Sequence, residues 1–285
     1  MLWDVIGRSP RAMAHGADLP GRIAHVPGGV ALNVAIAIAR RDMLPAILSA
    51  VGRDAEGEAL IAAARACGVV TDYLCREGGP TDVYMAIEDI HGLIAAIADA
   101  HSLEAAGEAV LAPLRDGRLG SAERPWEGIA VIDGNLTEAL LSRIADEPGL
   151  ARADLRIVPA SPGKAERLAP LIGAAHGCFY LNRHEAEVLA GRALPDAATA
   201  ARAMLDRGMR RVLVTDGGET VADGLAGHGI VTALPPRVAI ARVTGAGDSF
   251  LAAHLAAEYA GAGRAEALNR AARAAAAHVS GKDMP

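Results

Sequence analysis

The chain has 285 residues and a formal net charge of −6, because 34 aspartates and glutamates outnumber 28 lysines and arginines. This length suits one large α/β domain, or one domain with a small appendage. Hydrophobic residues make up 52% of the chain and aromatic residues only 3%, so alanine and small aliphatic side chains must fill the core. The acidic balance, with basic residues spread along the chain, argues against a nucleic-acid or membrane-surface partner.

Several classes of protein lack their signatures in this sequence. No apolar run approaches the roughly 20 residues of a membrane-spanning helix, and the N-terminal residues do not have the pattern of a secretory signal. Three cysteines without CxxC spacing favour neither a disulfide framework nor a zinc site, so we expect a reducing, cytoplasmic compartment. Neither lysine lies in a Walker A loop, and the motifs GxSxG, HExxH and HxxxH do not occur.

The N-terminal part of the chain predicts two strands and two helices. Apolar residues at helical spacing indicate the helices, the first ending before Pro45 and the second at Gly68. Residues 8–27 are rich in Gly, Pro and Arg, which indicates loop or short edge strands. The expected elements are strand Leu2–Ile6, helix Val30–Arg41, strand Ala46–Val51 and helix Glu56–Cys67.

Residues 72–99 show a different pattern, in which apolar residues alternate instead of recurring at helical spacing. Every second residue from Val83 to Ile87 is apolar, and a second apolar run follows a turn at Asp89–Gly92. This pattern is typical of a β-hairpin. We expect residues 72–99 to form, with part of residues 8–27, a small antiparallel lid inserted in a single domain of residues 1–285.

The rest of the chain alternates strands with helices. Apolar strands that are each followed by a helical segment predict a mostly parallel sheet covered by helices on both faces. Ligands of such sheets bind at the carboxyl ends of the strands, so the residues that follow each strand are the candidates for function. The expected strands are Ile129–Ile132, Leu155–Val158, Cys178–Leu181 and Arg211–Thr215.

The most informative motif is Val243–Phe250, VTGAGDSF, which precedes a helical run at Leu251–Ala257. Small residues at Gly245–Gly247 leave backbone N–H groups uncovered at a helix N-terminus, where they attract anions. Asp248 falls in the first turn and has the chemistry to deprotonate an alcohol as it attacks a phosphoryl group. Simple N-capping by Asp248 or Thr244 is the alternative, but the eight-residue context favours the chemical interpretation.

Two other segments carry polar residues that have both a structural and a chemical explanation. Gly28 and Gly29 permit close approach of a ligand, and Asn33 is a lone amide among apolar residues that needs a partner when buried. A satisfied core amide explains Asn33 equally well. Asn182 and Glu185 fit a capping box or a site that steers Mg²⁺, and their place after a strand favours the second.

Taken together, these segments resemble the PfkB/ribokinase family of carbohydrate and nucleoside kinases. GGVALNVA at Gly28–Ala35 and VTGAGDSF at Val243–Phe250 occur in the family's order, with NRHE and TDGG between them. The resemblance implies a ribokinase-like three-layer α/β sandwich with a mostly parallel central sheet and a small antiparallel β lid. The secondary motifs YMAIEDIHGLIAAIAD and VPASPGK are similar to those of family members that phosphorylate pseudouridine.

The resemblance implies an enzyme that uses ATP and Mg²⁺ to phosphorylate the 5′-hydroxyl of pseudouridine. Asp248 would be the general base, and the amides of Gly245, Ala246 and Gly247 would bind the transferring phosphate. The other implied sites are a substrate site at Gly28, Gly29, Asn33 and Asp99, an ATP site at Lys164, Thr215, Gly217, Thr244 and Asn269, and a Mg²⁺ site at Asn182 and Glu185.

Three positions depart from the family pattern. Arg242 stands where an Asp usually borders a monovalent-cation site, Thr220 replaces the closing glycine of the nucleotide loop, and Gly7–Arg11 contains no Asp. The first departure argues against activation by a monovalent cation. A kinase of a free sugar or another nucleoside and a non-catalytic nucleoside- or nucleotide-binding relative stay open as alternatives. The apolar hairpin also predicts a homodimer formed through the lid.

Overall fold

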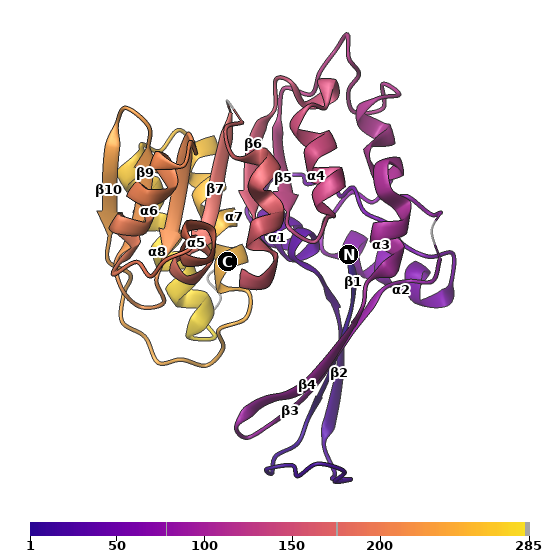
Figure 1. Ribbon diagram of the computed structural model, residues 1–285. Coiled ribbons are helices and arrows are strands. Elements are labelled where there is room, and N and C mark those ends of the chain that lie inside the picture. Colours follow the sequence, from indigo (N-terminus) through magenta and orange to yellow (C-terminus); the bar gives the residue numbers. More distant parts are fainter. Residues whose placement is uncertain (78, 175, 283–285) are drawn as a thin grey trace. The chain divides into compact units, whose positions relative to one another are not determined.

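The computed structural model describes the chain as two compact units, each with its own β-sheet (Figure 1). None of the helices within its described ranges combines the length and apolar character needed to cross a membrane. The described residues are 1–77, 79–174 and 176–282. Unit 1 comprises Met1–Ile36 and Leu44–Val110, and unit 2 comprises Ala37–Met43 and the chain from Leu111 onward.

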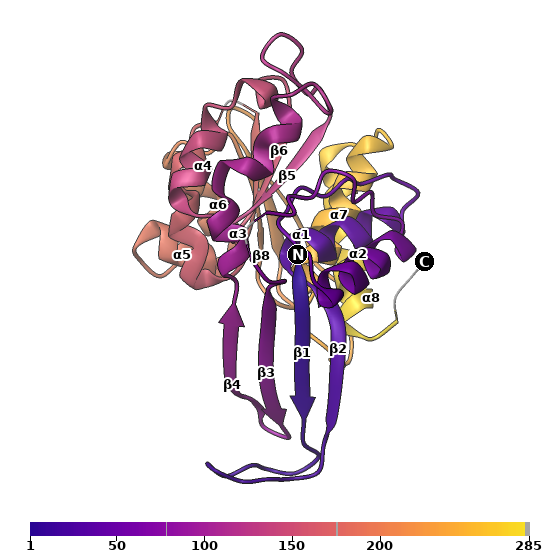
Figure 2. The same ribbon diagram turned by 90° about the vertical axis from the view of Figure 1, so that its right-hand side faces the viewer.

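Unit 1 contains a four-stranded sheet, here called the lid sheet, with strand order β2-β1-β3-β4 (Figure 2). The pairs β1/β2 and β3/β4 are antiparallel, and β1/β3 is parallel. The strand expected at Leu2–Ile6 and the hairpin expected within residues 72–99 are both present. The strands are β1 (Leu2–Arg8), β2 (Arg22–Gly28), β3 (Val83–Asp89) and β4 (Gly92–Asp99).

In unit 1, the helices α1 and α2 pack with β1 around a small apolar core. Trp3 is buried in this core, and its indole Nε1 donates to the Glu56 carbonyl at 2.9 Å. Asp54 caps the second helix by accepting from the Gly57 N–H at 2.8 Å, and the chain leaves that helix through Gly68 at φ +84°. The helices are α1 (Val30–Ala39), α2 (Ala55–Ala66), α3 (His101–Ala106) and the 3₁₀ helix η1 (Gly107–Leu114).

The prediction of a continuous strand at Ala46–Val51 is wrong. Only two isolated parallel bridges form there, Ala46 with Val70 and Ala50 with Cys75. The chain advances by one residue more between Val70 and Cys75 than between Ala46 and Ala50. This extra residue interrupts the ladder, as in a β-bulge.

Unit 2 contains the six-stranded central sheet, with strand order β10-β9-β8-β7-β6-β5. The strands β5 to β8 are parallel to one another, which confirms the four strands expected there. The strands are β5 (Ile129–Asp133), β6 (Asp154–Val158), β7 (Gly177–Asn182), β8 (Arg211–Thr215), β9 (Val221–Leu225) and β10 (Gly229–Ala233).

The expectation that every one of these strands is followed by a helical segment is wrong at β8. The Glu219 N–H donates to the Asp216 carbonyl at 2.9 Å, and Gly217 adopts φ +56° in the same turn. This tight turn sends the chain back antiparallel into β9, and β10 then extends the sheet. The sequence analysis did not include these last two strands.

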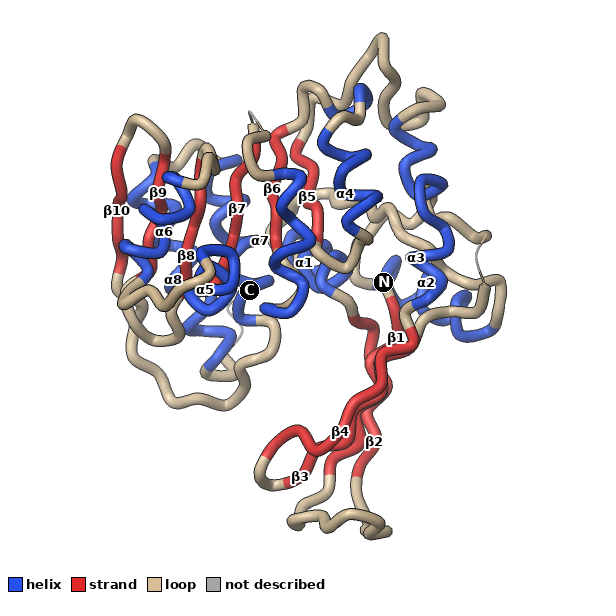
Figure 3. The backbone as a smooth tube through the Cα atoms, viewed as in Figure 1, coloured by secondary structure: helices blue, strands red, loops and turns tan. Residues whose placement is uncertain are grey.

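Helices cover both faces of the central sheet, which gives unit 2 three layers (Figures 1 and 3). The face that carries α7 and α8 is closely packed, because alanines such as Ala252 and Ala271 are buried between these helices. One face carries α4 (Glu138–Ala145), η3 (Pro162–Leu171), α5 (Arg183–Ala190) and α6 (Ala197–Asp206), and the other α7 (Ala246–Tyr259) and α8 (Arg264–Val279); the short η2 (Pro148–Leu150) precedes β6.

Candidate active site

Helix α7 determines which end of the central sheet holds Asp248. Near the end of this helix, Glu258 accepts from Arg156 near the start of β6 and from Arg211 at the start of β8, at 2.6 Å each. Asp248 lies about 15 Å along the helix from Glu258, at a rise of about 1.5 Å per residue. The helix therefore runs antiparallel to the parallel strands, and Asp248 lies toward their carboxyl ends, where ligands bind.

The N-terminus of α7 has no side-chain cap. Its N-cap residue is Gly245 at φ +85°, a conformation that favours glycine, and the first helical hydrogen bond runs from the Ser249 N–H to the Gly245 carbonyl at 3.0 Å. The N-cap residue is therefore neither Thr244 nor Asp248, the two residues of the structural alternative. An added Cβ on Gly247 would meet no atom within 4 Å, so the surface beside it is open to a ligand.

The amide of Ala246 already has a partner within the loop. Its N–H donates to the Val243 carbonyl at 3.1 Å. The predicted anion-binding role of Gly245–Gly247 therefore falls chiefly on Gly247, whose N–H precedes the first helical hydrogen bond. Asp248 itself is half-buried in the first turn, as expected from the motif.

His278, from the last turn of α8, is a residue of this loop that the sequence analysis missed. Its Nε2 lies 2.8 Å from the Thr244 carbonyl oxygen, and the Arg242 Nε donates to the His278 carbonyl at 3.2 Å. An added Cβ on Gly245 would lie 3.0 Å from the His278 ring. No motif signals this contact, because it depends on how α8 packs against α7.

The carboxyl ends of β7 and β8 bring two predicted site residues side by side. Asn182 and Thr215 are register partners in the parallel ladder. The loops after these strands are tied together, since the Arg183 Nε donates to an Asp216 carboxylate oxygen at 2.9 Å. Gly217 follows in the turn with positive φ, so the predicted ATP-site residues of β8 occupy the same sheet edge as the predicted Mg²⁺ ligands.

Asn182 and Glu185 form the capping box of α5, so their structural role is real. The Asn182 side chain accepts from the Glu185 N–H at 2.8 Å, and the Glu185 carboxylate accepts from the Asn182 N–H at 2.7 Å. Burial raises the pKa of Glu185 to about 7. A neighbouring cation would stabilise the ionised form of this carboxyl group. Within the described ranges, no cluster of three or more His, Cys, Asp or Glu side chains could hold a metal ion.

Two other predicted ATP-site residues have different surroundings. The Lys164 Nζ donates to the Asn135 side-chain oxygen at 2.7 Å, which joins the segments that follow β6 and β5. Asn269 lies on the exposed face of α8, where its Nδ2 donates to the Ala265 carbonyl at 2.7 Å. It is about 13 Å along this helix from His278, so the structure does not bring Asn269 to the glycine loop.

In unit 1, the predicted substrate residues lie where β2 meets α1. Gly29 has φ +92°, and its carbonyl accepts the first hydrogen bond of α1 from the Asn33 N–H at 2.9 Å. The Asn33 side chain is half-exposed and has no hydrogen-bond partner among the described residues, unlike a satisfied core amide. Asp99 ends β4 and is exposed, with His101 4.0 Å away.

Asp4 is a second residue that the sequence analysis missed. Its carboxylate lies so close to Gly28 that an added Cβ there would come within 2.1 Å of an oxygen. Burial raises the pKa of Asp4 above its usual value. The sequence analysis sought an acidic residue after the first strand, in Gly7–Arg11, whereas the structure places one inside β1, beside the glycine pair.

A parallel sheet with a glycine-rich helix N-terminus, an acidic residue in the first helical turn and polar residues at the strand ends has the parts that phosphoryl transfer needs. The model of the pfkB family of carbohydrate kinases matches residues 1–283, and the chain belongs to this family. It is therefore a phosphotransferase with an alcohol acceptor, a kinase of small carbohydrates or nucleosides.

Individual relatives are similar over most of the chain. Pseudouridine kinase of Escherichia coli (strain K12) is 30% identical over 255 residues, 87% of this chain and 78% of the relative. A carbohydrate kinase from Agrobacterium tumefaciens is 28% identical with a TM-score of 0.79, covering 97% of this chain and 87% of that structure. Ribokinase of Arabidopsis thaliana, solved with ribose and ATP, has a TM-score of 0.78 at 20% identity, covering 98% and 89%, which confirms the ribokinase-like fold.

Proposed function

We propose that this kinase transfers the γ-phosphate of ATP to the 5′-hydroxyl of pseudouridine. The observation that carries the choice of substrate is the 30% identity to a pseudouridine kinase, which extends over 87% of the chain.

Asp248 is the proposed general base. It lies at the open N-terminus of α7, one residue after Gly247, whose surroundings have room for a phosphate. A carboxylate there accepts the proton of the attacking hydroxyl, while the amides and the dipole at the helix N-terminus stabilise charge on the transferring phosphate. Positioning and electrostatics of this kind account for most of the catalysis in phosphoryl transfer.

Asn182, Glu185, Thr215, Gly217 and Lys164 are the proposed ATP and Mg²⁺ residues. Bound Mg²⁺ neutralises charge on the phosphates and is commonly held by one or two carboxylates together with phosphate oxygens. Glu185 fits this requirement because burial raises the pKa of its carboxyl group, and a nearby Mg²⁺ would stabilise the ionised form. The carboxylate already accepts a hydrogen bond from the backbone N–H of Asn182. Asn269 is proposed as a contact of ATP on the exposed face of α8 alone.

Asn33 and Asp4 are the proposed contacts to the hydroxyl groups of the acceptor. Both are partly buried polar side chains next to the Gly28–Gly29 pair, and the Asn33 side chain has no partner within the described ranges. An amide and a carboxylate together offer both donors and acceptors to a sugar ring. Asp4 would supply the acidic group that Gly7–Arg11 lacks.

We also propose that this enzyme does not require a monovalent cation. The guanidinium of Arg242 lies beside the loop that ends in the GAGD motif, and it contacts the ring and the carbonyl of His278. A fixed positive charge at this place substitutes for a bound cation.

The lid sheet is the proposed dimer interface. All residues of β4 are exposed, and Ile97 keeps 70% of its surface accessible. Contiguous apolar surface and an unpaired edge strand are features that proteins normally cover. Sedimentation velocity should show a dimer that Ile97→Glu converts to monomer, whereas Leu44→Glu, an exposed leucine outside the lid sheet, should leave it unchanged. A monomeric wild type would contradict this interface.

ADP release with ATP and Mg²⁺ tests the function directly. The acceptors are pseudouridine, uridine, ribose, fructose and ketodeoxygluconate, and the Asp248→Asn variant serves as the background. Turnover confined to pseudouridine supports the proposal. Turnover on another acceptor keeps the kinase and rejects the substrate. ATP binding without turnover on any acceptor would instead favour a relative that binds nucleotide without catalysis.

A further inference from the structure

A cavity of about 380 Å³ opens at the amino ends of the central strands of unit 2, at the edge opposite to the one toward which Asp248 lies. Strands β6, β7 and β8 begin at its wall, and the antiparallel β9 ends there. Its lining residues are Arg152, Ala153, Asp154, Arg156, His176, Gly177, Cys178, Arg210, Arg211, Leu225 and Arg264.

The lining is rich in arginine, and four of its five arginines pair with carboxylates. Five arginines contribute to it, against the single carboxylate of Asp154. Asp223 and Glu258, which pair with these arginines, are not among the lining residues. His254 and Tyr180 add no charge, because burial lowers the pKa of His254 to about 4 and raises the pKa of Tyr180.

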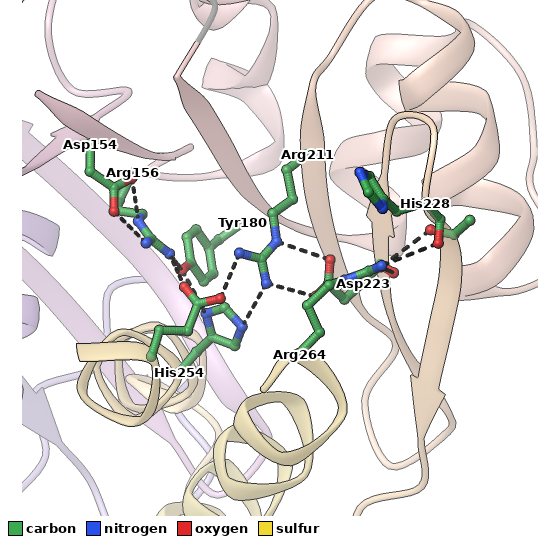
Figure 4. Close-up of polar contacts among 10 residues, drawn as sticks. Asp154, Arg156, Tyr180, Arg211, Asp223, His228, His254 and Arg264 are labelled. Atoms are coloured by element: carbon green, nitrogen blue, oxygen red, sulfur yellow. Dashed lines mark hydrogen bonds and ion pairs between the residues drawn. The ribbon is translucent and has the colours of Figure 1, made fainter. Parts of the chain in front are cut away.

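Three of the arginines are held rigidly (Figure 4). Arg156 pairs with Asp154 and Glu258, Arg211 with Asp223 and Glu258, and Arg264 with Asp223 and two backbone carbonyls of the adjoining turn. The side chain of Arg156 is only 8% exposed. Guanidinium groups fixed in this way need little reorganisation when they bind a ligand.

Each fixed guanidinium keeps donor capacity. An arginine has five N–H donors, and the hydrogen bonds of Arg156, Arg211 and Arg264 occupy four of them in each case. One N–H of each arginine is left without a partner in the described part of the chain. Each of these N–H groups can donate to a ligand or to water.

The other two arginines are exposed at the rim of the cavity. Arg152 pairs with the exposed Glu127, and Arg210 has no ion pair or side-chain hydrogen bond within the described residues. Arg210 therefore adds a positive charge that no carboxylate of the described chain neutralises. Surplus charge at the entrance of a preorganised donor cluster attracts anions.

We propose that this cavity binds a phosphate group, either free or as the monoester of a small metabolite, at a site separate from the phosphoryl-transfer site. A phosphate offers several acceptor oxygens and up to two negative charges, which match several single N–H donors and the charge of Arg210 better than a monovalent carboxylate does. Arg156 and Arg211 also donate hydrogen bonds to Glu258 of α7. A bound anion therefore accepts from the same guanidinium groups that anchor the helix carrying Asp248.

The test is a titration with inorganic phosphate followed by amide chemical shifts of the isotope-labelled protein. Lining amides such as those of Ala153, Gly177 and Leu225 should shift with one saturable isotherm, distinct from that of Gly245–Gly247. The variant Arg152→Gln/Arg210→Gln should weaken the cavity isotherm at least tenfold. The matched control Arg192→Gln/Arg202→Gln removes two exposed arginines of unit 2 outside the cavity and should leave it unchanged.

Ribose 5-phosphate and AMP, titrated in the same way, distinguish the two sources of the phosphate group. Binding at least tenfold tighter than that of inorganic phosphate identifies a metabolite monoester, and equal binding identifies free phosphate; either result supports the site. Shifts confined to Gly245–Gly247, or a cavity isotherm that the rim variant does not weaken, would overturn the proposal. Both substituted rim residues are exposed, so the variant is expected to fold.

Discussion

The two ends of the central sheet of unit 2 are built by opposite means. At the carboxyl end, α7 begins with an uncapped glycine turn, and Gly247 has open space beside it. At the amino end, the same helix is fixed by Glu258, which is shared between the buried Arg156 and the partly buried Arg211. A helix anchored firmly at one end can therefore present an open terminus at the other.

The carboxyl end, here called the open end, holds the proposed catalytic groups, and the arginine cluster at the amino end, here called the closed end, anchors α7 beside the proposed phosphate cavity. Groups at the open end are small or half-exposed, so replacing them should alter turnover more than folding. Groups at the closed end are buried and paired, so replacing one partner should alter folding.

Asp248→Asn should lower turnover by about 10²–10⁴, because the variant cannot accept a proton from the acceptor hydroxyl. The free energy of unfolding should remain near that of the wild type. Steady-state ADP release measures the first quantity and thermal unfolding the second. Asp206→Asn, at the exposed end of α6, is the control and should change neither. Wild-type turnover in Asp248→Asn would remove the residue from the base role.

Asp223→Asn should destabilise the protein by about 3–5 kcal/mol, because it leaves Arg211 and Arg264 without their shared buried counter-charge. Asp223 is fully buried, which is why solvent cannot replace the lost charge. Denaturant unfolding measures the change. Asp116→Asn, in an exposed pair with Arg118, should unfold close to the wild type. Equal stability of both variants would show that the closed end does not anchor the helix.

Glu185→Gln should flatten the pH dependence of stability between about pH 4.5 and pH 7. The pKa of Glu185 is about 7 when folded, against 4.5 as its ordinary value, so the folded protein binds the extra proton. Its contribution is fully present below pH 4.5 and is lost as the pH rises through 7, a change of about 3 kcal/mol.

Unfolding of the wild type, of Glu185→Gln and of the exposed control Glu166→Gln at several pH values measures this contribution. The control should follow the wild type. If Glu185→Gln also followed the wild type across this window, the carboxyl would not be the titrating group.

The variants Gly245→Ala and Gly247→Ala should distinguish backbone strain in the glycine turn from access of ATP to it. Gly245 has φ +85°, and a Cβ added there would lie 3.0 Å from the His278 ring. We therefore expect Gly245→Ala to destabilise the protein by about 1–3 kcal/mol. At Gly247 an added Cβ has room, so this variant should fold normally. The KM for ATP should rise, because the Cβ would occupy space proposed for the phosphate. The same loss of stability in both variants would mean that the turn is uniformly strained.

The sequence predicted the central sheet well because its strands have strong local signals. Apolar runs of strand length located β5 to β8, and turn residues located the hairpin β3/β4. The error at Ala46–Val51 arose because pairing there depends on one extra residue in the partner segment. The strands β9 and β10 were missed because the turn at Asp216–Glu219 was interpreted as a generic turn or a nucleotide loop, with no strand expected after it.

The candidate site was predicted in part, for a related reason. The glycine loop and Asp248 form one continuous motif, so local sequence reveals them. Asp4 and His278 come from distant parts of the chain and contact the motif residues Gly28 and Thr244 only in the folded structure. Asn269 was predicted from its place along the chain, but in the folded structure it lies on the exposed face of α8.

The family, the β3/β4 hairpin and the strands β5 to β8 could be recognised from the sequence alone, since each depends on residues that are neighbours along the chain. The tertiary structure decided which residues are partners across the fold: His278 with Thr244, Asp4 with Gly28, and the arginines of β6 and β8 with Glu258. These contacts arise from packing and from the pairing of buried charges, whose partners no local pattern specifies.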